Sequence, residues 1–335
     1  MKDKSVMSDF SQRIANLSPE KRALLEQRLM KEEEGSASKV SERKKTARIK
    51  TGASQTSPPL QPVSRDRRLR LSFAQERLWF VSQLETDNPF YNIPVAVRIT
   101  GPLNVSAIEK SINEIIRRHE VLRTTCSTIY GQPVQVISPA APLALSTVDL
   151  RGLPKPDRED RAVKLATQEA RRPFDLANGP VLRATLLWLG EEDYLLLLTT
   201  HHFVADGWSM DVLYKELSTL YETFSTGRPS PLPELPIQCA DFAYWQRQRL
   251  QGEVLETQRR YWKKQLAGGP AVTELPIDRP RPAVQTYRGS MQSFELPETL
   301  SEAIKALSRR EGVTLFMTLL AAFPVSYTHL RAHET

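Results

Sequence analysis

The sequence has few of the residues that mark disulfide-linked, secreted or membrane proteins. Only two of its 335 residues are cysteines, Cys126 and Cys239, and they form no CxxC pair. This scarcity argues against a disulfide scaffold and predicts a reduced, cytoplasmic protein. The start, MKDKSVMSDF, lacks the apolar segment of a secretory signal, and the longest strongly apolar stretch, 313–323, is too short to span a bilayer. We therefore expect no membrane association and a buried helix at 313–323.

Several common site signatures are also missing. The sequence contains no GxxxxGK[ST] phosphate loop, no GxGxxG, no HExxH and no GxSxG. These absences leave no motif-based reason to expect a P-loop nucleotidase, a dinucleotide-binding enzyme, a zinc protease or an α/β-hydrolase.

The net charge of +7 is confined to the first part of the chain. Residues 1–70 carry 17 Lys and Arg against 9 Asp and Glu, whereas the remainder has a net charge of −1. A basic leader on a neutral body is typical of a solvated, flexible segment rather than of a nucleic-acid reader. We expect no nucleic-acid partner.

The composition along the chain predicts a leader, a linker and a folded body. Residues 1–34 include a short amphipathic helix that could serve as a linker or docking element, and 35–67, rich in Ser, Thr, Lys and Pro, read as a disordered linker. From residue 68 onward, strand-like segments such as 95–100 and 195–200 alternate with helical patterns. One helix follows Asn104, a candidate cap, and another follows Ser209. This alternation predicts an α/β fold with helices packed on sheets.

The segment LLLLTTHHFVADGWSM, 195–210, concentrates polar groups at the end of a buried strand. His201 and His202 are two of only five histidines, and Asp206 and Gly207 follow them. Neighbouring strand residues point to opposite faces, so one imidazole should face a cavity while the other is packed. Three interpretations compete: a general base, a metal site with Asp206, or a pair of hydrogen-bonded core histidines. Gly207 is expected to allow a sharp turn into the next helix, and Asp206 fits either a helix cap or an ion pair.

Four blocks in order give this sequence a family resemblance. HHFVADGWS resembles the HHxxxDG motif of the condensation domains of non-ribosomal peptide synthetases. LSFAQERLWFVSQL (71–84) resembles SxAQxRLWxL, RHEVLRTTC (118–126) resembles RHExLRTxF, and QCADFAYW (238–245) resembles YxDFAxW. Cys126, Cys239 and Val81 depart from the family pattern, at positions that look like packing sites. The resemblance covers about residues 68–324.

The resemblance implies a fold related to chloramphenicol acetyltransferase, an α/β sandwich with a first lobe at 68–240 and the start of a second lobe at 241–324. It implies amide-bond formation between a donor acyl or peptidyl thioester and an acceptor aminoacyl thioester. Both would be carried on phosphopantetheine arms of peptidyl carrier domains, with an adenylation domain adjacent and no cofactor or metal bound directly. The wording DGWS, with NPFYNIP at 88–94, resembles domains that join two L-configured residues. A coenzyme A-dependent acyltransferase and a non-catalytic recruitment domain of the same fold are the alternatives.

Carried over to this sequence, His202 is the motif histidine that faces the substrate tunnel. The resemblance leaves open whether it acts as a general base or positions the amine and stabilises the tetrahedral intermediate. His201 is then its packed partner, Asp206 is expected to pair with Arg118 or Arg123, and Gly207 gives the acceptor arm room. Trp245, in the fourth block, is expected to support the site by packing.

The family pattern stops at residue 324. Residues 325–335, VSYTHLRAHET, match one reading frame of a transposon-end sequencing adapter. We therefore expect this tail to be adapter-derived and the chain to be an incomplete, inactive fragment whose apolar helix at 313–323 lacks packing partners. Amplification across codon 324 tests this, and a genuine stop codon after Thr335 would contradict it.

Overall fold

The computed structural model describes residues 59–331 apart from residues 86, 271–276, 278, 281–288 and 290–291. The predicted helical leader (1–34), most of the predicted linker and the last four residues lie outside this part of the chain. The elements in chain order are β1 (Leu69–Arg70), α3 (Phe73–Leu84), β2 (Asn92–Thr100), α4 (Val105–Arg118), the short 3-10 helix η1 (Glu120–Arg123), β3 (Thr124–Ile129), β4 (Gln132–Ile137), β5 (Ser146–Asp149), α5 (Lys155–Arg171), β6 (Leu182–Gly190), β7 (Asp193–His201), α6 (Gly207–Ser225), α7 (Cys239–Arg249), α8 (Gly252–Leu266), α9 (Glu298–Arg310) and α10 (Leu315–Arg331).

The larger sheet has the strand order β2-β7-β6-β5, with β7 in its middle. Strand β7 pairs antiparallel with both β2 and β6, and β5 joins the edge of β6 in parallel. Side chains alternate along β7: Leu196 and Leu198 belong to the core on one face, and Leu195 and Leu197 to the core on the other. A strand covered on both faces needs apolar residues at successive positions, which explains the run of four leucines.

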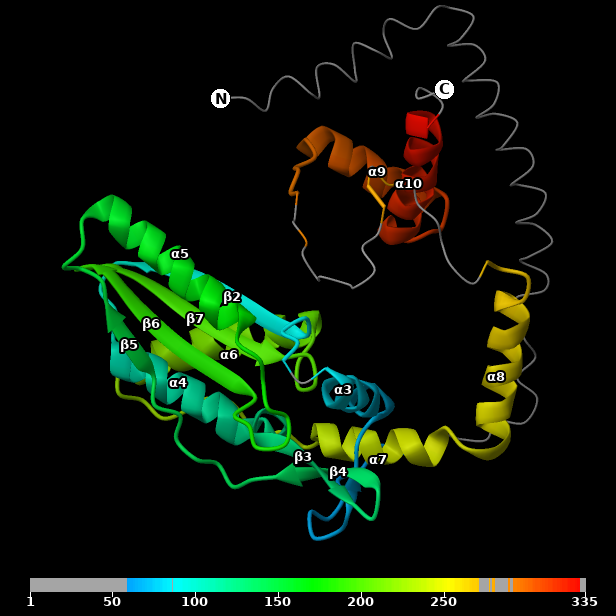
Figure 1. Ribbon diagram of the computed structural model, residues 1–335, viewed down its shortest axis with the longest axis horizontal. Helices are drawn as coiled ribbons and strands as arrows, with labels where there is room; N and C mark the ends of the chain where they lie inside the picture. Colours follow the sequence, from blue (N-terminus) through cyan, green and yellow to red (C-terminus); the bar gives the residue numbers. More distant parts are fainter. Residues whose placement is uncertain are drawn as a thin grey trace, which may run out of the picture. The chain divides into compact units, whose positions relative to one another are not determined.

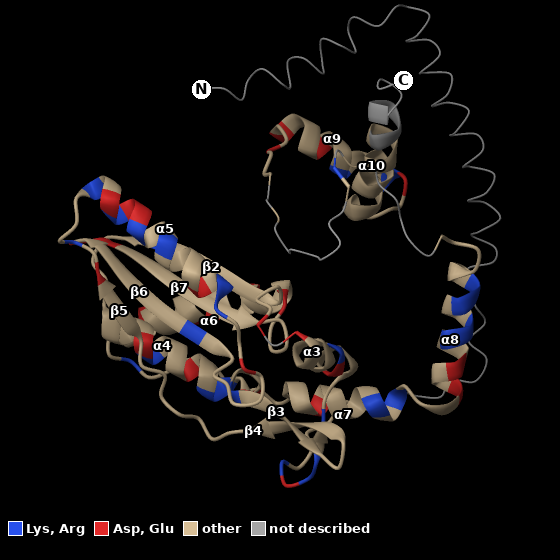
Figure 2. Cartoon of the chain, viewed as in Figure 1, with Lys and Arg blue, Asp and Glu red and all other residues tan. Residues whose placement is uncertain are grey.

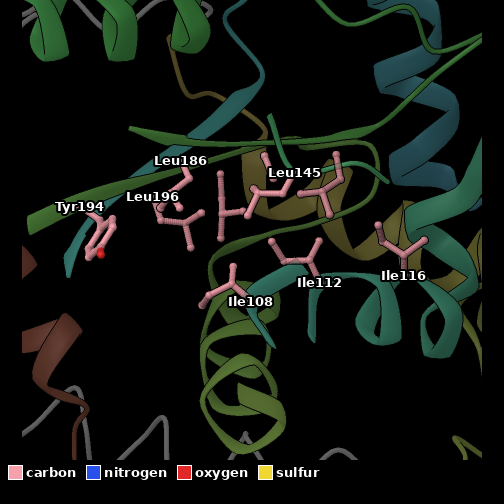
Figure 3. Packing of buried hydrophobic residues seen from close by; sticks show 10 residues of the cluster. Ile108, Ile112, Ile116, Leu145, Leu186, Tyr194 and Leu196 are labelled. Carbon is pink, nitrogen blue, oxygen red and sulfur yellow. The ribbon is translucent and has the colours of Figure 1, made fainter. Parts of the chain in front are cut away.

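Helices cover both faces of this sheet (Figure 1). Helices α4 and α6 lie on one face, where Ile108, Ile112 and Ile116 of α4 pack against Leu186 and Leu196 (Figure 3). Helix α5 covers the other face. Each fully buried isoleucine contributes about 1.5–3 kcal/mol relative to an exposed one. The predicted α/β sandwich is therefore confirmed.

The N-terminus of α4 begins as predicted. The side chain of Asn104 accepts a hydrogen bond from the backbone N–H of Ala107 at 3.0 Å. The helix after the histidines does not begin as predicted, because Asp206 rather than Ser209 is its cap. Ser209 instead lies in the first turn of α6, where its backbone N–H bonds to the Asp206 carboxylate.

The charged residues lie mainly on the helices, and the central strands are almost free of them (Figure 2). Strand β7 changes character at its end, where Thr199, Thr200 and His201 are buried although they are polar. Buried polar groups need hydrogen-bond partners. The hydroxyl of Thr200 donates to the Val181 carbonyl at 3.0 Å, and His201 is satisfied within the loop described below.

The smaller sheet has the order β1-β4-β3. A two-residue turn joins β3 to β4, with Ile129 opposite Gln132. Tyr130 and Gly131 both have positive φ, at 50° and 72°. This combination is typical of a type I′ turn, whose twist matches that of the flanking strands.

Ordered contacts begin before residue 68, inside the predicted linker. The Arg65 guanidinium contacts the Asp241 carboxylate at 2.6 Å and the Glu120 carboxylate at 2.8 Å, and the Val63 N–H donates to Asp241 at 2.8 Å. Asp241 is only 1% exposed, so its charge needs these partners. Val63 and Arg65, which lie within the predicted linker, thus contact the body of the fold.

The last three helices carry few buried side chains. Helix α8 has acidic Glu253 in its first turn and basic Lys263 and Lys264 in its last, an arrangement that complements the helix dipole (Figure 2). Helices α9 and α10 contact each other through the hydroxyls of Ser308 and Thr318, 2.7 Å apart.

Helix α10 confirms the helix predicted at 313–323, and the predicted boundary at 324 falls inside it. Phe316 and Leu320 of this helix are exposed, which differs from the burial expected from the apolar stretch alone. Exposed apolar side chains of this kind lower solubility when they form a continuous patch.

Candidate functional site

The histidine loop, residues 201–206, begins where β7 ends against the start of β2. His201 lies opposite Asn92 in the β2–β7 register. The next backbone N–H, that of His202, donates to the Tyr91 carbonyl at 2.8 Å, and the His201 carbonyl accepts from the N–H groups of Val204 and Ala205. The backbone on both sides of His202 is therefore fixed by hydrogen bonds before any side chain is considered.

His201 is the packed histidine. It is 5% exposed, and its Nδ1 accepts the backbone N–H of Phe203 at 3.0 Å. An accepting Nδ1 requires the neutral ring with its proton on Nε2. Burial, and secondarily the neighbouring His202, lowers the pKa of His201 to about 4. His201 is thus a neutral ring that shapes the loop.

His202 is the exposed histidine. Its side chain is exposed, whereas that of His201 is buried, and it lies in the turn that follows β7. The Tyr91 ring lies near both imidazoles: its centroid is 6.5 Å from that of His202, edge-on, and 6.1 Å from that of His201. An accessible imidazole on a rigid backbone is suited to accept or donate a proton to a bound molecule.

The residues after His202 anchor the loop in the core. Phe203 and Val204 are buried in a cluster that includes Leu71, Leu78 and Phe174. The Phe203 carbonyl accepts a hydrogen bond from Nε2 of the buried Gln75, on α3, at 3.4 Å. The segment LSFAQERLWFVSQL (71–84), which contains Gln75, therefore contacts the histidine loop.

Asp206 is a helix cap in this structure. Its Oδ1 accepts from the backbone N–H of Ser209 at 2.8 Å and from the Ser209 hydroxyl at 2.6 Å. These hydrogen bonds lower the pKa of Asp206. The expected ion pair with Arg118 or Arg123 is not what the described residues show, because the first turn of α6 already satisfies this carboxylate.

Arg118 pairs with a carboxylate that the sequence analysis missed. It is 3% exposed, contacts Glu216 of α6 at 3.1 Å and donates to the Pro233 carbonyl. Glu216 also contacts His119 Nε2 at 2.8 Å. Burial alone would raise the pKa of Glu216, but the hydrogen bonds from Arg118 and His119 outweigh it and the pKa is lowered. Arg118 thus joins α4 to α6.

Arg123 and Trp245 make contacts of their own. The Arg123 guanidinium donates to the Ser138 carbonyl, beside the end of β4. Trp245 lies half-buried on α7, with the Phe242 ring at 5.8 Å and the Arg249 guanidinium at 5.1 Å from its ring.

Gly207 is the first residue of α6 and does not need glycine for its conformation. It is not among the glycines with positive φ, and a Cβ added to it would meet no atom within 4 Å. The turn into α6 therefore uses no backbone conformation that is special to glycine. A side chain at position 207 would therefore meet no neighbouring atom, and the next residue, Trp208, is exposed.

Gln75, Tyr91 and Glu216 are the contact residues that the sequence analysis did not assign to the site. Gln75 and Tyr91 lie in segments quoted for the family resemblance, which was a usable signal. Glu216 lies three residues after Leu213 and four before Leu220, on the apolar face of α6. A charged residue on such a face indicates a buried partner.

The described residues offer neither a metal cluster nor a membrane span. In the part of the chain that the structure describes, no group of three or more His, Cys, Asp or Glu residues could hold a metal ion. None of the helices described there combines the length and apolar character needed to cross a membrane.

Comparisons with known proteins agree with the fold. The chain is 54% identical over 268 residues to a linear gramicidin synthase protein of Brevibacillus parabrevis, covering 80% of this chain and 4% of that protein. It is 41% identical over 319 residues to phosphinothricin tripeptide synthetase PhsC of Streptomyces viridochromogenes, covering 95% of this chain and 28% of that protein. The chain thus spans less than a third of the length of either relative.

Solved structures show the same fold. The X-domain from teicoplanin biosynthesis has a TM-score of 0.66 and 30% identity, covering 77% of this chain and 56% of that one. The first condensation domain of the CDA synthetase has a TM-score of 0.63 and 21% identity, covering 78% and 62%. The family model described as the condensation domain matches residues 66–331. The chain therefore belongs to the condensation domain family of non-ribosomal peptide synthetases.

Proposed function

We propose that the chain forms the catalytic lobe of a domain that makes peptide bonds between two carrier-bound substrates. The donor is an acyl or peptidyl thioester and the acceptor an L-aminoacyl thioester, each on the phosphopantetheine arm of a peptidyl carrier domain. An adenylation domain in the same cytoplasmic synthetase would load the acceptor. One observation carries the proposal: the His202 side chain is exposed on a backbone that the Tyr91 carbonyl holds through the His202 N–H.

The chemistry requires little beyond alignment and the handling of one proton. The acceptor amine attacks the donor thioester carbonyl, the new C–N bond forms and the C–S bond breaks. The amine loses one proton and the departing sulfur gains one, so that an amide and a free thiol remain. A neutral His202 could take that proton, or hold the amine and stabilise the tetrahedral intermediate. Both roles need an accessible ring in a fixed place.

The neighbouring residues prepare His202 for this role. His201 shapes the loop as a neutral acceptor, and Asp206 starts α6 directly after it. The open space at Gly207 is proposed to receive the acceptor arm. Arg118, Arg123 and Trp245 support the lobe without being proposed to touch substrate.

A second candidate is a recruitment domain that binds another protein and performs no chemistry. The observation in its favour is the similarity, at 29% identity and a TM-score of 0.70, to the X-domain in a complex with OxyB from teicoplanin biosynthesis. Against it stands the intact HHFVADG segment of this chain.

The test is peptide formation between a loaded donor carrier and a loaded acceptor carrier. The domain is extended to the length of its solved relatives and compared with the chain alone, which we propose to be inactive. His202→Ala should abolish most product, whereas Asp211→Ala, an exposed position on α6, is the matched control. Undiminished product with His202→Ala would overturn the assignment. Transfer from acyl-coenzyme A alone would favour a coenzyme A-dependent acyltransferase, and no transfer from either donor would favour recruitment.

A further inference from the structure

Gln75 occupies an unusual place at the start of α3. It is the third residue of the helix and only 3% exposed. Its Oε1 accepts the backbone N–H of Ser72 at 3.0 Å, while the Ser72 hydroxyl accepts the backbone N–H of Gln75 at 3.2 Å. This reciprocal pair is a capping box, in which Glu and Gln serve equally well because only the oxygen is used.

The amide half of Gln75 does something that a glutamate could not do. Its Nε2 donates to the Phe203 carbonyl at 3.4 Å, at the long end for such a bond. A glutamate at this site would keep the cap but would place a buried carboxylate oxygen against a carbonyl oxygen. The choice of glutamine is therefore explained by the histidine loop rather than by the helix.

The peptide groups around Phe203 are consequently held from two sides. The Phe203 N–H donates to His201 Nδ1 at 3.0 Å, and the Phe203 carbonyl accepts from Gln75. The Phe203 ring is buried beside Leu71 and Leu78 from the same part of the chain as Gln75. His202 immediately precedes this clamped residue, and its own N–H is bonded to Tyr91.

We propose that Gln75 is a positioning residue for His202, acting through the Phe203 carbonyl. The inference deepens the proposed function and rests on it for its catalytic meaning. Losing the Gln75 amide donor frees one side of the loop, so that the His202 ring samples positions displaced from the reacting atoms. A displacement of about 1 Å can cost about a hundredfold in rate.

Two substitutions separate the loop contact from the helix cap. Gln75→Glu keeps the oxygen that caps α3 and removes the donor to Phe203. Ser72→Ala removes the cap hydroxyl and leaves the donor in place. Gln246→Glu is a matched control. Gln246 accepts the backbone N–H of Phe73, next to the cap residue, at 3.0 Å. The Phe203 carbonyl accepts its hydrogen bond from Gln75 and not from Gln246.

The first measurement is amide hydrogen exchange in residues 202–205, expressed relative to the amides of β7 in the same sample. Gln75→Glu should raise loop exchange about tenfold at pH 8, because local opening follows lost contacts. Ser72→Ala and Gln246→Glu should leave the ratio unchanged. This readout needs no catalysis, so it remains informative even if peptide formation is not observed.

The second measurement is the pH dependence of the same effect. Burial raises the pKa of an introduced carboxyl group, and its protonated form can donate to Phe203 while its other oxygen still caps the helix. Loop protection, and turnover in the extended domain, should therefore recover toward wild type between about pH 8 and pH 6 for Gln75→Glu alone. Loop exchange that is unchanged, that rises equally with Ser72→Ala, or that shows no recovery at low pH would overturn the proposal.

Discussion

The buried, neutral His201 predicts a specific loss of stability in mild acid. Its pKa in the folded chain is about 4, whereas an unfolded histidine titrates near about 6.5. Between these two pH values the histidine binds a proton in the unfolded chain but not in the folded chain. The neutral His201 therefore contributes fully to the free energy of unfolding above about pH 6.5. This contribution is lost as the pH falls toward 4, by about 3 kcal/mol in total. Protonation would also place a second hydrogen against the Phe203 N–H, which now donates to Nδ1.

His201→Asn isolates this effect. An asparagine oxygen can accept the Phe203 N–H in place of Nδ1 and does not titrate, while the lost ring volume costs a roughly constant 1–3 kcal/mol at every pH. Urea unfolding at half-unit steps from pH 7 to pH 4, followed by tryptophan fluorescence, gives the two curves. The wild type should lose about 3 kcal/mol more than His201→Asn over this range. Parallel curves would refute the reasoning, and exposed His202→Asn should keep most of the wild-type slope, because burial is the main cause of the lowered pKa of His201 and His202 the secondary one.

The remaining predictions concern the ion pair, the helix cap and the glycine. Arg118→Met should cost about 3–5 kcal/mol of unfolding free energy, because it leaves Glu216 uncompensated; adding Glu216→Leu should restore part of this, and additive losses would contradict a direct pair. Asp206→Ala should cost about 1 kcal/mol and Asp206→Asn almost nothing, since both Asp and Asn cap helices; equal losses in thermal denaturation would argue against the cap. Gly207→Ala should leave the melting temperature unchanged, whereas Gly207→Val should raise KM for the acceptor carrier. A melting temperature lowered by Gly207→Ala would show that the turn needs glycine after all.

Features that depend on local periodicity were predictable. The isoleucines of α4 repeat at helical spacing behind Asn104, and the leucines of β7 form an uninterrupted apolar run, so both elements and their buried faces follow from neighbouring residues. The contrast between a buried His201 and an exposed His202 was expected from alternation along a strand, and it is observed, although β7 ends at His201 and His202 lies in the following turn.

Features that depend on distance in space were not predictable in the same way. The partner of Arg118 is Glu216, 98 residues further along the chain, and nothing in the spacing distinguishes it from Asp206. Whether Asp206 caps a helix or meets an arginine depends on where α4 and α6 cross. The role of Gly207 depends on its φ angle and on whether neighbouring atoms would contact a Cβ at this position. Neither can be inferred from the residue type.

The pairing of β2 with β7 also has a consequence for synthesis of the chain on the ribosome. The strands are separated by about 100 residues, so at about 5–20 residues per second β2 waits for roughly 5–20 s before its partner is made. Until then its edge is open to other chains, and the Tyr91 carbonyl has no His202 N–H to accept. The site is therefore assembled late and in one step, together with closure of the sheet. Slow codons or chaperone contacts between residues 100 and 193 would act on the formation of the site itself.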